Sequence, residues 1–157
     1  MNLWLVLIAI ALIVASGLLI AAETAMTRVS KTRIDELRKE GNGNEKRAEL
    51  LLGVLQDRAR YVNVLFLLST IATITSITLI SYVAVRALTS GDGWSTWIAL
   101  VVVIAALVVV AYIGLGVAPR TLGRQHAERI ALIAARPPRF LATNLGARTT
   151  LLIVIGN

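Results

Sequence analysis

Three long stretches without a charged side chain limit what this chain can fold into. They run from Leu3 to Ala22, from Tyr61 to Val85 and from Ser95 to Ala118. A helix needs roughly 20 apolar residues to cross a bilayer core about 30 Å thick, and lipid offers no partner to free backbone groups. The chain, with 57% hydrophobic residues, is therefore predicted to be an all-α membrane protein with three transmembrane helices.

The basic residues are divided unevenly among the connecting segments. Nine Lys or Arg lie between the first and second stretches and six follow the third, whereas the segment between the second and third holds only Arg86. Because cytoplasmic loops carry the excess of Lys and Arg, we expect both basic segments in the cytoplasm and the N-terminus outside. Trp4, Trp94 and Trp97 would then lie at the outer interface, where amphipathic rings settle.

A cleavable signal peptide is the alternative interpretation of residues 1–22, because the small residues Ala21 and Ala22 end that stretch. Signal peptides begin with a positive segment and hold an apolar run of only roughly 7–15 residues. Met1 and Asn2 carry no charged side chain and the apolar run here is longer, which favours a retained helix.

The remaining segments show helical periodicity. Residues 27–55 predict a helical hairpin broken at Gly41–Asn44, with an apolar stripe on each arm (Val29, Ile34 and Leu37; Leu50, Leu51, Val54 and Leu55). An amphipathic helix is expected from Arg124 to Ala135, until a Pro-Pro pair ends it, and a last basic segment, Phe140 to Ile155, is expected along the inner membrane surface. One domain over residues 1–157 is thus predicted, with transmembrane helices at 3–26, 60–88 and 94–118, a cytoplasmic hairpin at 27–58 and juxtamembrane belt helices at 120–155.

Composition and pattern exclude several function classes. The net charge of +7 comes from basic residues in the segments between the apolar stretches, where anionic lipid is the expected partner. We therefore expect the chain to contact the lipid bilayer and not to bind nucleic acid. The absence of cysteine excludes disulfides, thiolate metal sites and cysteine nucleophiles. His126, the only histidine, is typical of a surface residue and not of a zinc site. Paired carboxylates, an activated nucleophile and a phosphate loop are all missing from the sequence, so we expect neither enzyme activity nor an organic cofactor.

The second span contains eight Asn, Ser or Thr residues: Asn63, Ser69, Thr70, Thr73, Thr75, Ser76, Thr78 and Ser81. On a helix, Ser69, Thr73 and Ser76 fall within one sector of about 60°. Small polar residues allow helices to approach closely and to form hydrogen bonds with one another. Hydroxyl oxygens are also acceptable ligands for hard cations, so helix packing and a hydrated or ion-binding path both remain open.

Glu23 directly follows the first apolar run. An acidic side chain at this depth normally faces the protein interior or pairs with a base. Arg28 and Arg120 are the candidates for such a pair, and the attraction of a cation is the alternative role.

Pro119 stands at the end of the third span and cannot donate a hydrogen bond to the carbonyl of Leu115. The neighbouring Gly114 and Gly116 permit either a simple proline kink or an unwound backbone. An unwound backbone would expose carbonyl oxygens to a cation, as broken helices of transporters do.

Short motifs mark the ends of the spans. They are Ala22-Glu23-Thr24-Ala25, then the basic hairpin, Asp57-Arg58-Ala59-Arg60-Tyr61, and Pro119-Arg120-Thr121-Leu122. In this order and spacing they resemble the transmembrane domain of the CNNM/CorC family of magnesium and cobalt transport or efflux proteins, over essentially the whole chain. The resemblance implies a homodimer in the bacterial inner membrane with Mg²⁺ as the divalent cation. It also implies a chain truncated before the paired CBS domains that usually follow in this family.

The chain departs from the family pattern at the positions that would hold an ion. Where the family has Asn-Thr-x-x-Asn in the second span, this chain has Ser69, Thr70 and Thr73. The family has Gly-Glu-x-x-Pro-Lys in the third span, and this chain has Leu115 and Gly116 in place of its Gly-Glu. In the first span, Ile20 replaces a serine that is common in the family. Mg²⁺ requires close to six well-placed oxygens, and these changes remove a carboxylate and two amide oxygens.

Two functions follow from this comparison. In the first, the chain is the membrane domain of a CorC-like Mg²⁺ transporter or exporter, with a site between the second and third spans. Its ligands would be Glu23, the hydroxyls of Ser69, Thr70 and Thr73, and the carbonyls of Leu115 and Gly116. In the second, a non-transporting homologue dimerises and anchors or relays regulatory cytoplasmic domains. The missing carboxylate and asparagines favour the second function, whereas Glu23 and Pro119 favour the first.

Overall fold

The computed structural model of the protein describes residues 3–41, 43–91 and 93–135. Over these ranges every regular element is a helix. The elements in chain order are α1 (Leu3–Arg28), α2 (Lys31–Lys39), α3 (Glu45–Gln56), α4 (Arg58–Gly91), α5 (Thr96–Ala111), the π-helical turn η1 (Tyr112–Val117), α6 (Ala118–Gln125) and α7 (Ala127–Ala134).

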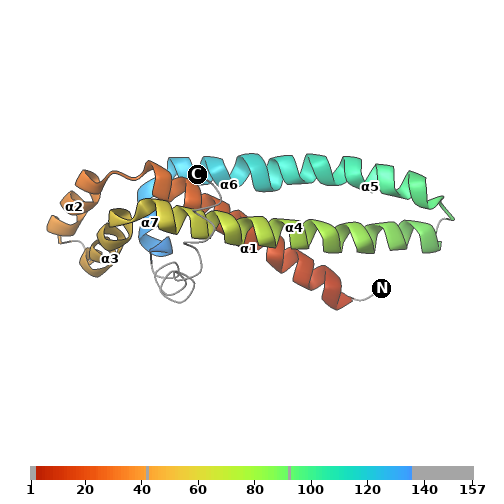
Figure 1. Cartoon of the computed structure of the whole chain (residues 1–157), viewed down its shortest axis with the longest axis horizontal. Coiled ribbons are helices and arrows are strands. Elements are labelled where there is room, and N and C mark those ends of the chain that lie inside the picture. The colour runs from red at the N-terminus through yellow and green to blue at the C-terminus, as the bar shows by residue number, and fades with distance from the viewer. Residues whose placement is uncertain (1–2, 42, 92, 136–157) are drawn as a thin grey trace.

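Three helical runs are long and apolar enough to cross a membrane: α1, α4 over Arg58–Ser90, and a continuous run Thr96–Gln125 made of α5, η1 and α6. The prediction of an all-α membrane protein with three transmembrane helices is thereby confirmed. In Figure 1, α4 and α5 run side by side while α1 crosses α4 at an angle.

Each run extends beyond the bounds predicted from hydropathy. The first ends at Arg28 and not at residue 26, the second begins at Arg58, and the third continues from Ala118 to Gln125. A helix does not have to stop where the hydrocarbon layer stops, and Arg28, Arg58, Arg124 and Gln125 at the ends of the runs are good helix formers.

The π-helical turn η1 interrupts the α-helical hydrogen bonding of the third run. The backbone N–H of Ala118 donates to the carbonyl of Ile113, five residues earlier, which is the π spacing. Pro119 follows at once, and its ring nitrogen has no proton to donate. The wider turn accommodates the proline within a continuous helix, so over residues 112–125 the structure contains neither an unwound segment nor a break.

The hairpin α2–α3 packs with α7 and the end of α1 into an apolar core at one end of the bundle (Figure 1). Ile34, Leu51 and Leu55 are buried in this core and Leu37 packs against it, as the two predicted stripes require. Across the surface, Arg33 of α2 forms an ion pair with Glu128 of α7 at 3.3 Å. The hairpin and α7 thus form one packed juxtamembrane unit.

The helix predicted from Arg124 to Ala135 is divided into two. α6 ends at Gln125 and α7 begins at Ala127, because His126 between them has φ −119° and ψ 37° and leaves the helical region. The change of direction buries Ala131 and Leu132 against the hairpin. The predicted Pro-Pro stop and the belt segment at 140–155 lie outside the described residues.

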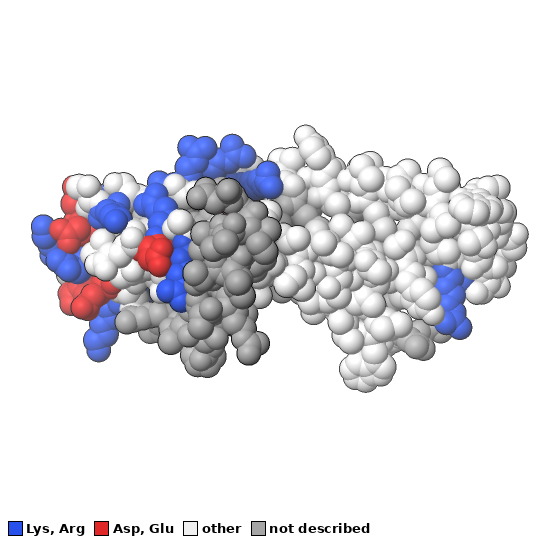
Figure 2. All heavy atoms as spheres, in the orientation of Figure 1, with Lys and Arg blue, Asp and Glu red and all other residues white. Residues whose placement is uncertain are grey.

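Charged side chains gather at the juxtamembrane end, whereas the long body of the molecule shows almost none (Figure 2). From Tyr61 to Pro119 the only Lys or Arg is Arg86. A band without charges between two polar ends is what a hydrocarbon layer about 30 Å thick requires.

Candidate functional site

Ser16 of α1 lies at the centre of the contact between α1 and α4. Its hydroxyl donates to the carbonyl oxygen of Ser69 at 3.3 Å and shares a hydrogen bond with the hydroxyl of Thr73. Ser16 is 0% exposed and Ser69 is 3% exposed. We call Ser16, Ser69 and Thr73 the hydroxyl cluster. The polar face of α4 is therefore directed at α1, whereas the predicted ion site lay between the second and third spans.

Three hydroxyl groups in the middle of α4 donate their protons to carbonyls of their own helix. Ser69 and Thr70 both donate to the carbonyl of Phe66, at 2.9 and 2.8 Å, and Ser76 donates to the carbonyl of Thr73 at 2.9 Å. Each such hydroxyl is satisfied in an apolar surrounding and keeps oxygen lone pairs available. Thr70 makes this bond on an exposed side of α4 and is not joined to the hydroxyl cluster.

Gly17, the next residue after Ser16, contacts the third run. A Cβ atom at Gly17 would lie 3.5 Å from Cγ of Pro119, which is itself buried. One turn before Pro119, Leu115 is the buried residue of η1, and η1 also contacts α1. Two successive residues of α1 therefore touch α4 and α6, and they bring the hydroxyl cluster beside the π-helical turn.

Glu23 is partly buried, and its carboxylate interacts electrostatically with Arg120 across the α1–α6 contact. Within the described residues Glu23 forms no ion pair at 4 Å or less, so the contact with Arg120 is longer than a salt bridge. Glu23 follows Ser16 by seven residues, which is about 10 Å along a helix. The carboxylate therefore lies toward the juxtamembrane end and not within the hydroxyl cluster.

The oxygen atoms of the hydroxyl cluster belong to hydroxyl and carbonyl groups. In the part of the chain that the structure describes, no three His, Cys, Asp or Glu side chains come together as a metal site. Mg²⁺ takes oxygen ligands and usually retains several waters. The three residues of the hydroxyl cluster alone therefore do not supply the roughly six oxygen ligands of a dehydrated Mg²⁺.

Two features of this site were missing from the sequence-based prediction. Ser16 is the only hydroxyl-bearing residue between Leu3 and Ala22, and that isolation in an apolar run was the available signal. The π-helical turn was the second, and the combination of Gly114, Gly116 and Pro119 marked its place without defining its hydrogen bonds.

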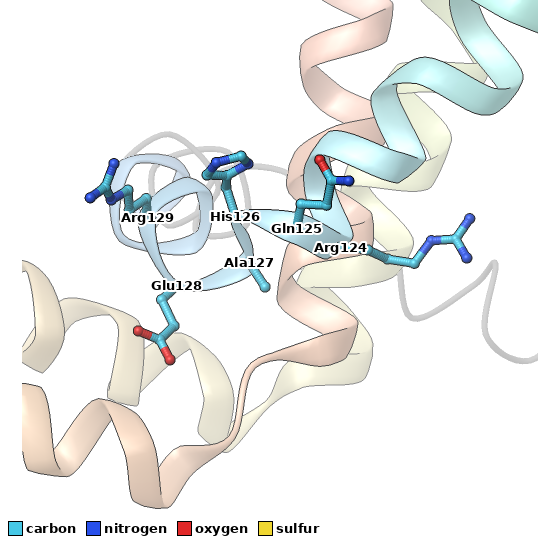
Figure 3. Close-up of a pocket in the computed structure, with 6 residues that line it drawn as sticks. All are labelled: Arg124, Gln125, His126, Ala127, Glu128 and Arg129. Atoms are coloured by element: carbon cyan, nitrogen blue, oxygen red, sulfur yellow. The ribbon is translucent and has the colours of Figure 1, made fainter.

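A polar pocket of about 490 Å³ lies at the junction of α6 and α7, lined by Arg124, Gln125, His126, Ala127, Glu128 and Arg129. In Figure 3 the side chains of Arg124 and Arg129 point in opposite directions and Glu128 points toward the hairpin. His126 is exposed in this pocket. The polar groups do not converge on one point, so they do not form a coordination site there.

Residues 7–157 match the family model described as the cyclin M transmembrane N-terminal domain. The chain is also 39% identical over 149 residues to the UPF0053 protein Rv2366c of Mycobacterium tuberculosis, covering 94% of this chain and 32% of that protein. The UPF0053 protein Mb2387c of Mycobacterium bovis matches with the same identity and coverage. The chain thus spans about a third of the length of these curated relatives.

Proposed function

The chain belongs to the cyclin M transmembrane N-terminal domain family, and from that premise we propose that it is the membrane domain of a divalent-cation transporter or exporter with Mg²⁺ as its substrate. The observation that carries this proposal is the hydroxyl cluster, buried between α1 and α4 beside the π-helical turn. Hydroxyl groups between membrane-spanning helices can join the helices by hydrogen bonds, and their oxygens are also acceptable ligands for hard cations.

The geometry suggests how a cation could pass. The proton of a hydroxyl group rotates about the C–O bond, so Ser16 and Thr73 could turn their protons aside and present oxygen lone pairs to a hydrated ion without moving the helices. The π-helical turn one residue before Pro119 would be the moving part of the third run in this proposal, since such turns inside α-helices are often found at functional sites. Movement of α6 would act on Gly17 and so on Ser16 beside it.

Glu23 and Arg120 would act at the juxtamembrane entrance in this proposal. A carboxylate there attracts cations, and the positive charge of Arg120 limits how tightly a cation is held. We place this entrance on the cytoplasmic side, following the excess of Lys and Arg, and we expect a homodimer to be the working unit.

The second candidate function, a non-transporting membrane domain that anchors or relays regulatory domains, is favoured by one observation. Between Tyr61 and Ala118 the second and third spans hold no carboxylate, so a dehydrated Mg²⁺ would lack charge compensation there.

Magnesium flux separates the two functions. The full-length protein in proteoliposomes should carry Mg²⁺ across the membrane, and Glu23→Ala should lower that flux. If the full-length protein folds but shows no Mg²⁺ flux, the transport function is disproved and the anchoring function is favoured. Flux that is unchanged in Glu23→Ala would remove only the role of Glu23.

A further inference from the structure

A groove lies between α4 and α5 at the end of the bundle opposite the hairpin. It has a volume of about 500 Å³ and is lined by Ser81, Tyr82, Val85, Arg86, Thr89 and Leu100. Five of these residues come from one face of α4 and one from α5, so the groove follows the seam between two spans. Its lining combines one cation and hydroxyl groups with apolar side chains, which is the combination that an amphiphile requires.

Arg86 occupies a defined depth in the membrane. It directly follows the charge-free stretch Tyr61–Val85, whose 25 residues are about 37 Å long as a helix against a hydrocarbon core of about 30 Å. The guanidinium therefore lies at the level of the lipid headgroups. Figure 2 shows almost no other charge on this part of the surface. Among the described residues from Tyr61 to Pro119, Arg86 is the only group that can meet an anion with a positive charge.

The Arg86 side chain is held in place by Tyr82. Its Nη1 donates to the hydroxyl oxygen of Tyr82 at 3.0 Å, one helical turn deeper in the membrane. A guanidinium has five N–H donors, and this bond uses one of them. The remaining donors match the two oxygens of a phosphate, and the hydroxyl of Tyr82 keeps its own proton to donate. Tyr82 is 54% exposed and Arg86 is exposed as well, so both groups face outward.

We propose that this groove binds one phospholipid of the leaflet opposite the hairpin, with its phosphate on Arg86 and Tyr82 and an acyl chain against Val85 and Leu100. The charge of Arg86 complements a phosphate, and the apolar seam below it continues into the hydrocarbon layer. The bound lipid would join α4 to α5 on the side where the hairpin cannot brace them. The proposal goes beyond transport and stands whether or not an ion passes the hydroxyl cluster.

The test measures lipid binding to the full-length protein in a nonionic detergent. Three probes separate the parts of the ligand: phosphatidylglycerol carries phosphate and chains, diacylglycerol carries chains only, and inorganic phosphate carries the anion only. Phosphatidylglycerol should bind, and Arg86→Gln should weaken its affinity roughly tenfold, the loss expected for a charge-assisted hydrogen bond. Leu100→Trp, which fills the groove and leaves the arginine in place, should also weaken binding.

Two further variants control for loss of charge and loss of fold. Arg47→Gln removes the same charge from an exposed position on α3, far from the groove, and should bind as the unmodified protein does. Arg86→Lys keeps the charge but not the planar fork, and should restore part of the affinity. Equal binding by Arg86→Gln and Arg47→Gln would overturn the proposal. Binding of inorganic phosphate as tight as that of the lipid, or a disulfide between two copies of a Leu100→Cys variant, would overturn the lipid as occupant.

Discussion

Gly123 of α6 lies directly against the backbone of α1 at Ala21. A Cβ atom at position 123 would stand 2.5 Å from the carbonyl oxygen of Ala21 and 2.9 Å from Cβ of Thr24. One turn earlier on α1, Gly17 meets Pro119 in the same contact. Small residues at four-residue spacing allow helix backbones to approach closely in a membrane. This contact sets the position of α6, and so of the π-helical turn before it, along α1 relative to the hydroxyl cluster.

Gly123→Ala should therefore destabilise the protein. The atoms that a methyl group would strike belong to the backbone and Cβ of α1, which cannot move aside as the tip of a flexible side chain could. Overpacking of this kind costs about 1–3 kcal/mol. Gly53→Ala in α3 is the matched control, because nothing lies within 4 Å of its Cβ position, and it should be neutral or stabilise by up to about 1 kcal/mol. Unfolding in denaturant, followed by tryptophan fluorescence, measures both, and equal stability of the two variants would disprove the close contact.

Arg58 at the start of α4 should be needed to hold the end of α1. Its guanidinium donates to the carbonyl of Thr27 in the last turn of α1 at 3.4 Å and to the carbonyl of Val29, just after α1, at 2.7 Å. The last carbonyls of a helix have no N–H donor within the helix, so Arg58 acts as a cap. Arg58→Gln should lower the free energy of unfolding by about 1.5–3 kcal/mol, the usual range for hydrogen bonds to a charged group. Arg47→Gln on the exposed face of α3 should change it by less than about 0.5 kcal/mol. A similar loss in both variants would mean that net charge, and not this cap, is responsible.

Thr73→Val should reduce Mg²⁺ flux if the hydroxyl cluster lies on the ion path. The variant keeps the shape of the side chain and removes the oxygen that bonds to Ser16, so a drop of roughly tenfold is expected for one lost polar contact. Thr78→Val, on an exposed side of the same helix, removes a hydroxyl that bonds only to the carbonyl of Ile74 and should transport normally. Normal flux with a lowered stability in Thr73→Val would assign the cluster to helix packing alone.

The three spans and the juxtamembrane core could be predicted because both depend on properties that are local in the sequence. The length of a charge-free run can be counted in the sequence without knowing which helices it contacts. The helical spacing of the stripe that contains Leu51 and Leu55 can be recognised in the same way. The direction of the α4 hydroxyl face could not be predicted in this way. Periodicity places Ser69 and Thr73 on one face but does not say whether α1 or the third run covers it.

The contacts of single residues carried even less signal. Ser16 is one hydroxyl in an apolar run, and only the angle at which α1 crosses α4 puts it beside Thr73. The π-helical turn required knowledge of where the Ile113 carbonyl finds its donor, which depends on how Pro119 is seated against Gly17. Both features arise from packing between helices, which periodicity and short motifs do not reveal.

The stability of the α2 helix should decrease in acid through Asp35. A hydrogen bond from Lys39, together with the charges of Lys39 and Arg38, holds the pKa of Asp35 below its ordinary value of 3.8 in the folded state. A depressed folded pKa means that the unfolded chain binds a proton first, so the stabilisation is complete above pH 3.8 and is lost as the pH falls toward the folded pKa. The effect is small because the pair is exposed to solvent. Titration of the Asp35 carboxyl carbon by NMR measures it directly, Lys39→Gln should raise that pKa, and an unchanged value in the variant would contradict the assignment.

The orientation of the bundle can be tested with cysteine labels, because the chain contains no cysteine of its own. Lys46→Cys places a thiol on the hairpin and Ser95→Cys places one before α5, both at exposed positions. The hairpin segment holds nine basic residues and the segment after the third span holds six, whereas the segment that contains Ser95 holds one. Because basic segments stay in the cytoplasm, Ser95→Cys should lie outside and react with an impermeant maleimide in intact cells. Lys46→Cys should react only after the cells are permeabilised. The reverse result would place the hairpin and Glu23 outside and reverse the direction of the proposed entrance. If neither thiol reacted in intact cells, the two sites would lie on the same side, and α4 would not cross the membrane as a single span.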